Sequence, residues 1–175
     1  MKTRIITGQV RLVKNNLWQA DAAKYYVELL ISKDDEATVS AIDAAVETAV
    51  EAGEKKYGSV FPQRDRLLMP LRDGDTEKSD PAYKGSLFLR ASTLYAPEIV
   101  DEQTQPVTDR KPLYPGSLAR VSLRFYPFAK NMPEGGNPVC GIAAELGNIQ
   151  LLAGGQRIYP RIRAAQEFMK LEKTA

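Results

Sequence analysis

The sequence contains no histidine and a single cysteine, Cys140, among its 175 residues. Without histidine, neither Ser-His-Asp nor Cys-His catalysis is available, and zinc sites built from cysteine and histidine are excluded as well. A single cysteine cannot form an intrachain disulfide, which fits a reducing compartment. An enzyme of this composition would depend on carboxylates, lysine, tyrosine or a hard metal ion such as Mg²⁺.

Long apolar runs are also missing. No stretch of 18 or more apolar residues occurs, so no transmembrane helix is expected, and the polar–apolar alternation of residues 1–7 does not match a secretory signal. Hydrophobic residues make up 43% and charged residues 26% of the chain, as in an ordinary globular protein. We therefore expect one folded domain at 1–155, followed by a basic tail at 156–175.

Charge is present but segregated along the chain. The formal net charge is only +2. Residues 34–54 contain seven acidic residues and no lysine or arginine, so the rest of the chain has nine more basic than acidic residues. Basic residues gather at 1–14 and 109–130. If this segregation also holds in space, one face is cationic and can hold phosphate groups; the alternative is that the charges simply lie on a solvated surface.

The spacing of apolar residues predicts a mainly β chain with one helix. Strands are expected at 3–13, 24–32, 84–92, 117–128 and 139–152, a helix at 35–56 capped by Ser32 or Asp34, a turn at Asn15-Asn16, and long loops at 58–83 and 96–116. This pattern favours an OB-fold, a five-stranded Greek-key barrel. A β-sandwich usually needs more strands, and a parallel α/β sheet needs a helix after most strands.

The helix is predicted to be amphipathic. Its apolar stripe, which includes Ile42, Val46 and Val50, should pack on the barrel. Most of its acidic residues lie on the opposite face and should point to water, away from any bound DNA.

Aromatic and basic residues share the outward faces of several predicted strands. Bases stack on aromatic rings for about 1–3 kcal/mol each whatever their identity, and arginine and lysine hold the phosphates between them. A duplex hides its base faces, so this combination favours single strands. The candidate nucleic-acid-binding residues are Arg11, Lys14, Tyr26, Lys84, Phe88, Arg90, Arg120, Arg124 and Tyr126. We expect no catalytic residue, metal or cofactor.

Three alternatives remain open at this stage. In the first, Phe88, Tyr126 and Phe128 pack beneath the long loops, and Trp18 is buried rather than a stacking platform. In the second, the carboxylates of the 73–80 loop, including Asp73, Asp75 and Asp80, hold Mg²⁺ for phosphodiester cleavage, although a turn-forming Asp-Gly pair explains part of this cluster. In the third, the basic face binds an acidic partner in a virion.

Four segments resemble blocks of a known family. They are residues 70–85, which begin Pro70-Leu71-Arg72-Asp73-Gly74-Asp75, together with 24–31, 114–126 and 141–150. In order and spacing they are similar to phage single-stranded-DNA-binding proteins that were long catalogued as a domain of unknown function, and also to those of T-odd phages. The resemblance implies an OB fold and binding of single-stranded DNA during replication or recombination, in the cytoplasm of the infected bacterial host.

The tail departs from that resemblance. Related T-odd proteins end in an acidic segment that contacts replication proteins and a second copy of the chain. Residues 171–175 here read Leu-Glu-Lys-Thr-Ala, which is not acidic. Phage or host replication proteins and a homodimer remain candidate partners from the resemblance, but the departure argues against contacts made through an acidic tail. The basic tail becomes a candidate DNA contact instead.

Overall fold

The computed structural model describes residues 2–21, 24–132 and 134–171. The strands within them are β1 (Arg4–Ile6), β2 (Val10–Asp21), β3 (Lys24–Ser32), β4 (Leu71–Asp73), β5 (Ser86–Thr93), β6 (Ile99–Val100), β7 (Leu118–Lys130) and β8 (Val139–Leu152). The helices are α1 (Glu36–Tyr57), α2 (Gly74–Glu77) and α3 (Ala164–Glu167), with 3-10 turns η1 (Gly58–Val60), η2 (Arg64–Arg66) and η3 (Pro81–Tyr83). In this part of the chain no helix is both long and apolar enough to span a membrane.

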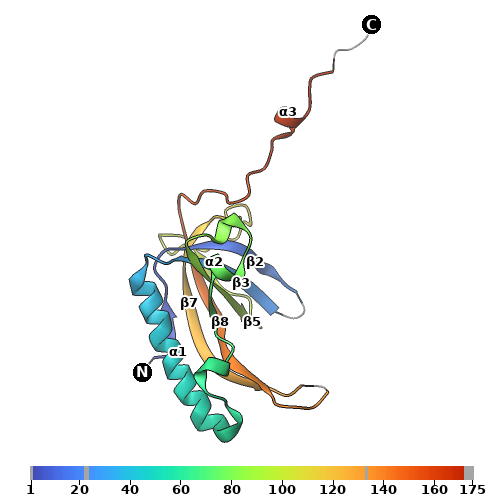
Figure 1. Cartoon of the computed structure of the whole chain (residues 1–175). Helices are drawn as coiled ribbons and strands as arrows, with labels where there is room; N and C mark the ends of the chain where they lie inside the picture. The colour runs from blue at the N-terminus through green and yellow to red at the C-terminus, as the bar shows by residue number, and fades with distance from the viewer. Residues whose placement is uncertain (1, 22–23, 133, 172–175) are drawn as a thin grey trace.

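Five of the strands close into a ring (Figure 1). The cyclic order is β2, β3, β5, β8 and β7, and β7 pairs with β2 again to complete it. The pairing of β5 with β8 is parallel, as in the pair Ala91 and Ala144, whereas the other pairings of the ring are antiparallel. The prediction of a five-stranded barrel of the OB type is confirmed.

Alternation along the strands builds the core. Leu12, Leu29, Leu89 and Leu123, from four different strands, are each at most 1% exposed. Because successive side chains of a strand point to opposite faces, the intervening residues lie on the outer surface of the barrel. That alternation places Tyr26 and Arg90 outside.

Helix α1 packs its apolar face on this core. Ile42, Val46 and Val50 are buried as predicted, and the acidic side chains of the helix are exposed. The N-cap, however, is Asp35, whose carboxylate accepts from the backbone N–H of Thr38 at 3.1 Å. The expectation that Ser32 or Asp34 caps the helix is therefore wrong. The predicted bounds of the helix, 35–56, agree with the observed bounds within one residue.

Two expectations about chain organisation are wrong. The predicted strand at 3–13 is two strands, and Asn15-Asn16 lies inside β2, where Asn15 pairs with Val27 and Asn16 with Tyr26. The predicted loop 58–83 contains β4, α2 and three 3-10 turns. Pairing with β3 decides the conformation of Asn15-Asn16, and pairing with β5 decides that of β4, which a reading of local turn propensity does not capture.

Candidate nucleic-acid interface

The centre of the candidate interface is a contact between Tyr26 and Arg90 on the outer face of β3 and β5. The guanidinium carbon of Arg90 lies 4.0 Å from the centroid of the Tyr26 ring. Register explains the contact, because Tyr26 pairs with Ser92 and Arg90 pairs with Glu28, the next outward residue along β3. The tyrosine is half-buried and the arginine exposed. A cation held over a ring offers a base-stacking surface and a phosphate ligand at one place.

A buried carboxylate lies beside this pair. Glu28 is 7% exposed and accepts a hydrogen bond from the hydroxyl of Tyr83. Burial, and then this carboxylate, raise the pKa of the Tyr83 hydroxyl, so the phenol stays protonated and continues to donate. Glu28 pairs in register with Lys14 on one side and Arg90 on the other. Exposed Lys14 thus extends the row of outward cations from β5 across β3 to β2.

The expectation that Phe88 offers an exposed ring is wrong. Phe88 points outward from the barrel but is only 3% exposed. Tyr83 packs edge-on against it, with ring centroids 5.5 Å apart, and Arg72 and Lys78 lie 5.0 and 4.7 Å from its ring centroid. With Val13 and Leu30, the rings of Phe88 and Tyr83 form a second, smaller apolar cluster on the outside of the barrel. Segment 74–84 covers this half of the β3–β5 face and leaves the half with Tyr26 open.

Arg124 and Tyr126 form a second pair on the outer face of β7. The Arg124 guanidinium carbon lies 5.9 Å from the Tyr126 ring centroid, and Tyr126 is 37% exposed. The Nε of Arg124 also donates to the carboxylate of Glu145 at 2.5 Å. Register connects this pair to the first, because Ser92 on β5 pairs with Glu145 on β8, which pairs with Arg124. The two pairs are therefore two strands apart on the barrel.

Arg11 and Lys84 line the same cleft and form the third cationic group of the surface. Both line a cleft of about 270 Å³ between β2, β3 and the end of η3, together with Gln9, Ser32 and Ser86. Within the described residues neither side chain forms an ion pair. Their charges are thus available to an anion.

Arg120 is separate from these groups. Its Nε donates to the backbone carbonyl of Thr7 at 3.4 Å, next to β1. In the described chain no hydrogen bond, ion pair or cation–π contact joins it to another candidate residue. The other exposed candidates form three pairs and Lys14.

Sequence reasoning missed Tyr95. It lies two residues after the end of β5 and is 80% exposed, next to Leu94, which is 63% exposed. Its backbone N–H donates to the hydroxyl of Thr93, which pairs with Tyr25 at the start of β3. Tyr95 thus lies at the Tyr26 end of the β3–β5 face. The available signal was an aromatic residue just past the end of a strand and before Ala96-Pro97.

Trp18 does not offer an exposed ring for stacking. It is half-buried and packs against the main core, with Arg110 5.9 Å from its ring centroid.

The carboxylates of segment 73–80 have partners in the protein. Lys33 Nζ lies 2.7 Å from Asp73 and 2.6 Å from Asp75, and the hydroxyl of Tyr159 donates to Asp80. Among the described residues no group of three or more acidic or cysteine side chains is placed to hold a metal ion. The cluster therefore ties segment 74–84 to the barrel.

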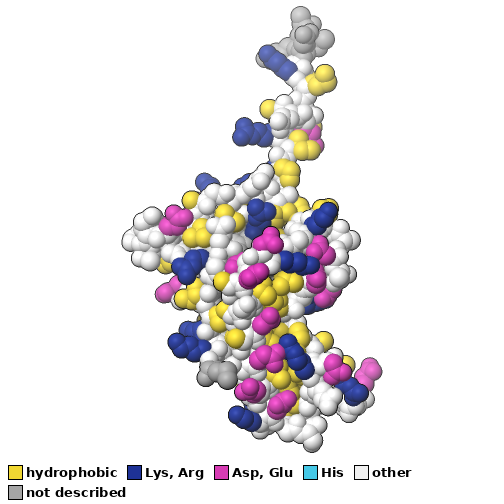
Figure 2. Space-filling model, turned by 60° about the vertical axis from the view of Figure 1, so that its left-hand side comes forward, with side chains coloured by type: hydrophobic (Ala, Val, Ile, Leu, Met, Phe, Trp, Pro, Cys, Tyr) yellow, Lys and Arg dark blue, Asp and Glu magenta, His cyan; other side chains and the backbone are white. Residues whose placement is uncertain are grey.

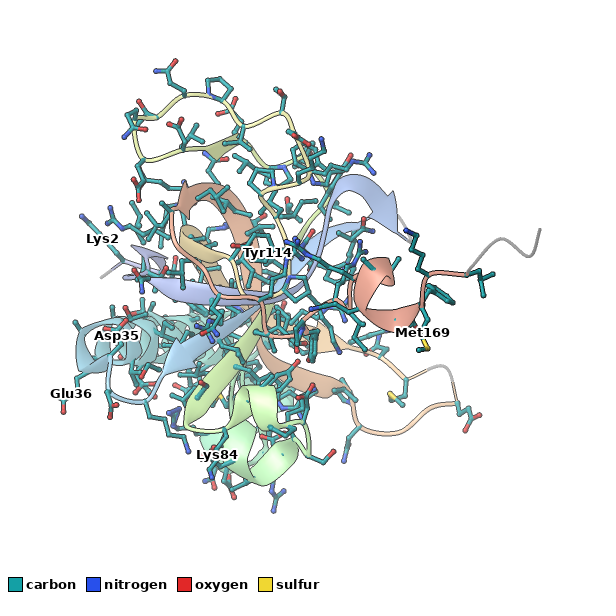
Figure 3. All side chains as sticks on the ribbon, turned by 90° about the horizontal axis from the view of Figure 1, so that it is seen from above. Lys2, Asp35, Glu36, Lys84, Tyr114 and Met169 are labelled. Carbon is teal, nitrogen blue, oxygen red and sulfur yellow. The ribbon has the colours of Figure 1, made fainter. Side chains whose placement is uncertain are left out.

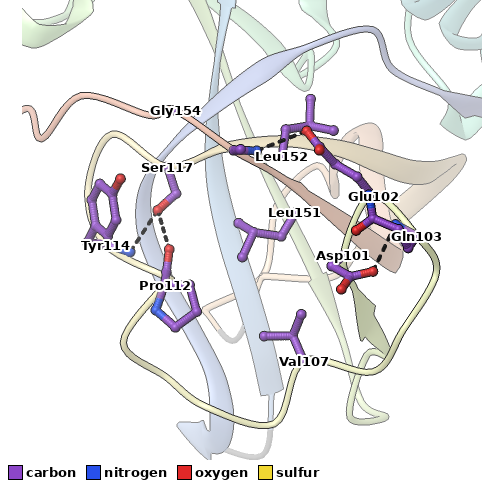
Figure 4. Close-up of a pocket in the computed structure, with 11 residues that line it drawn as sticks. Asp101, Glu102, Gln103, Val107, Pro112, Tyr114, Ser117, Leu151, Leu152 and Gly154 are labelled. Atoms are coloured by element: carbon purple, nitrogen blue, oxygen red, sulfur yellow. Dashed lines mark hydrogen bonds between the residues drawn. The ribbon is translucent and has the colours of Figure 1, made fainter.

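A cavity of about 410 Å³ lies where loop 101–116 meets the end of β8 (Figure 4). Asp101 and Glu102 line it, and both carboxylates accept backbone N–H groups, those of Gln103 and Ala153. The hydroxyl of Ser117 donates to the carbonyl of Pro112 at 2.8 Å. Its acidic lining makes this cavity a poor site for phosphate groups.

Comparison with known proteins identifies the family. The model of a family described as the single-stranded-DNA-binding protein of Enterobacter phage Enc34 matches residues 3–175. This chain belongs to that family. A relative, protein p50 of Acyrthosiphon pisum secondary endosymbiont phage 1, is 30% identical over 142 residues, which are 77% of this chain and 71% of p50.

Solved structures share the fold. The single-stranded DNA-binding protein of bacteriophage Enc34 in complex with single-stranded DNA has a TM-score of 0.70 and 19% identity, covering 90% of each chain. The single-stranded DNA-binding protein gp2.5 of bacteriophage T7 has a TM-score of 0.67 and 15% identity, covering 100% of each chain. The resemblance expected from the sequence to Enc34-type and T-odd phage proteins is confirmed.

Proposed function

We propose that the protein binds single-stranded DNA without sequence preference, by stacking bases on exposed rings while arginine and lysine side chains neutralise the phosphates. The observation that carries the proposal is the contact of Arg90 with Tyr26 on the open half of the β3–β5 face, in a chain that belongs to a family of single-stranded-DNA-binding proteins. Both parts of a nucleotide, base and phosphate, find a partner there.

The path of the strand follows from the positions of the pairs. Tyr95, Tyr26 and Arg90 lie at one end of the β3–β5 face. Neighbouring strands are about 4.8 Å apart, so Arg124 and Tyr126 are roughly 10 Å further around the barrel. Lys14 and the cleft of Arg11 and Lys84 lie on the β2 side. We assign these residues to the interface and leave out Phe88, which is covered, and Arg120, whose guanidinium donates to the backbone carbonyl of Thr7.

The biological role that fits this binding is protection and organisation of single strands during phage DNA replication or recombination. In that role the protein works in the cytoplasm of the infected bacterial host, and its partner is the strand itself. Replication proteins and a second copy of the chain are further candidate partners. The mechanism makes and breaks no covalent bond.

A titration tests the proposal. Labelled single-stranded and duplex oligonucleotides of equal length are titrated with the protein at several salt concentrations, with and without Mg²⁺. We expect preference for the single strand and a slope of log affinity against log salt of about −0.7 for each phosphate contact. Equal affinity for duplex and single strand would overturn the proposal. Fragments that form only with Mg²⁺, and not with Asp73→Ala, would point to a nuclease instead.

A further inference from the structure

A basic arm leaves the barrel beyond β8. We define the arm as residues 160–171, and each of its side chains is exposed. It carries Arg161, Arg163 and Lys170 against one acidic residue, Glu167. Figure 1 shows it running away from the barrel, and Figure 2 shows lysine or arginine side chains along it. Its twelve residues can reach about 40 Å when extended.

The base of the arm is fixed to the barrel by three consecutive residues. Arg157 lies over the ring of Tyr114, 4.2 Å from its centroid. The Ile158 backbone N–H donates to the Pro115 carbonyl at 3.0 Å, and its side chain packs on the cluster that contains Phe88. In the view from above, Tyr114 lies over the barrel and Met169 lies out on the arm (Figure 3).

The third anchor places the arm beside the candidate interface. The hydroxyl of Tyr159 donates to Asp80 at 2.5 Å. Asp80 caps η3, which leads into Lys84 of the cationic cleft. The pKa of Asp80 is lowered first by its hydrogen bonds with Tyr159 and Ala82, and also by the positive charge of Lys14. The arm therefore starts between cations that we assign to phosphate binding.

The cations of the arm are free to bind an anion. Within the described residues neither Arg161, Arg163 nor Lys170 takes part in an ion pair. Phe168 is 72% exposed, so a ring suited to stacking on a base accompanies these charges. An exposed segment with both features can contact a strand that continues past the barrel.

We infer that the arm is a second DNA-binding element, which holds the stretch of single strand that runs beyond the cleft of Arg11 and Lys84. This inference rests on the proposed function. It concerns affinity for strands longer than the barrel covers, because the arm reaches only nucleotides outside the barrel.

The test compares two double variants of the full chain. Arg161→Ala/Arg163→Ala removes two charges from the arm, and Lys55→Ala/Lys56→Ala removes two exposed charges from the last turn of α1, away from the arm. Each labelled protein is titrated with excess oligonucleotides of about 8 and about 20 nucleotides. One OB fold covers about 4–16 nucleotides, so only the longer strand reaches past the barrel.

We expect the arm variant to bind the short strand like the wild type. On the long strand its affinity should fall about 25-fold at 0.1 M salt, and its salt slope should fall by about 1.4, because two contacts are lost at about 0.7 each. The α1 variant should match the wild type on both strands.

Three results would overturn the inference. They are an unchanged affinity of the arm variant on the long strand, an equal loss on both strands, and tighter binding, which would mean that the arm competes with DNA. Failure of the wild type to bind either strand would instead overturn the proposed function.

Discussion

The guanidinium of Arg124 is ion-paired with the carboxylate of Glu145 on the neighbouring strand, with Nε and the oxygen 2.5 Å apart. Hydrogen bonding with that carboxylate raises the pKa of Arg124, but the pair has a second consequence. A negative charge next to a candidate phosphate ligand repels the phosphate and competes for the arginine. Glu145 thus holds Arg124 in place, and under the proposed function it weakens the attraction of Arg124 for DNA.

Glu145→Gln should therefore bind single-stranded DNA more tightly than the wild type. Exposed ion pairs contribute about 0.2–1 kcal/mol, so we expect a gain of up to about fivefold, measured by fluorescence anisotropy at low salt. Glu51→Gln on the exposed face of α1 makes the same change of charge at a residue outside the assigned interface and is the control. An equal gain in both variants would show that only net charge matters.

Tyr26→Ala should weaken binding by about 1–3 kcal/mol, the usual value of one base–aromatic stack, without unfolding the protein. Tyr26→Phe keeps the ring and should bind like the wild type. Oligonucleotide titration gives the affinities, and circular dichroism checks the fold. If Tyr26→Ala is folded and binds normally, the pair with Arg90 is not the stacking site.

Local sequence patterns correctly predicted the elements in which buried residues recur at a regular spacing. The alternation of Val27, Leu29 and Ile31 gave β3 its correct bounds, because one face of that strand is continuously buried. The stripe of α1 gave the helix within one residue. Closure of the barrel could be expected because five strands of this length leave few other arrangements.

The burial of Phe88 could not be predicted in the same way. Alternation correctly placed its side chain outside the barrel. Part of its cover comes from Ile158, seventy residues later in the chain, and no local pattern shows that Ile158 returns to β5. The exposure of Tyr95 could not be predicted locally either. Its ring lies in the segment after β5 and is exposed because no other described part of the chain packs over it.

Phe88→Ala should therefore lower stability rather than affinity. Removing a buried phenylalanine usually costs about 3–5 kcal/mol, and the site should be near the lower value because the outer cluster is small. Urea unfolding measures the loss. Affinity at a temperature where the variant is folded should change less than in Tyr26→Ala, and the reverse order would mean that the cover opens to expose the ring.

Lys33→Met should destabilise the protein in a pH-dependent way, because Lys33 ties Asp73 and Asp75 to β3. Its hydrogen bonds lower the pKa of both carboxyls from the ordinary 3.8, and Asp73, followed by Asp75, raises the pKa of Lys33 above 10.5. A lowered carboxyl pKa stabilises the folded state above pH 3.8, and this contribution is lost as the pH falls through the folded value. The raised lysine pKa stabilises it below pH 10.5, and that contribution is lost as the pH rises through the folded value.

The difference in unfolding free energy between wild type and Lys33→Met should thus be constant across neutral pH and shrink below pH 3.8. Urea unfolding at about pH 7 and about pH 2.5 measures it at the two ends of the acid transition. Lys55→Met is the control, because Lys55 forms no ion pair in the described residues and its substitution should show no such dependence. A difference of the same size at both pH values would mean that Lys33 acts through the packing of its methylene groups, since packing does not titrate.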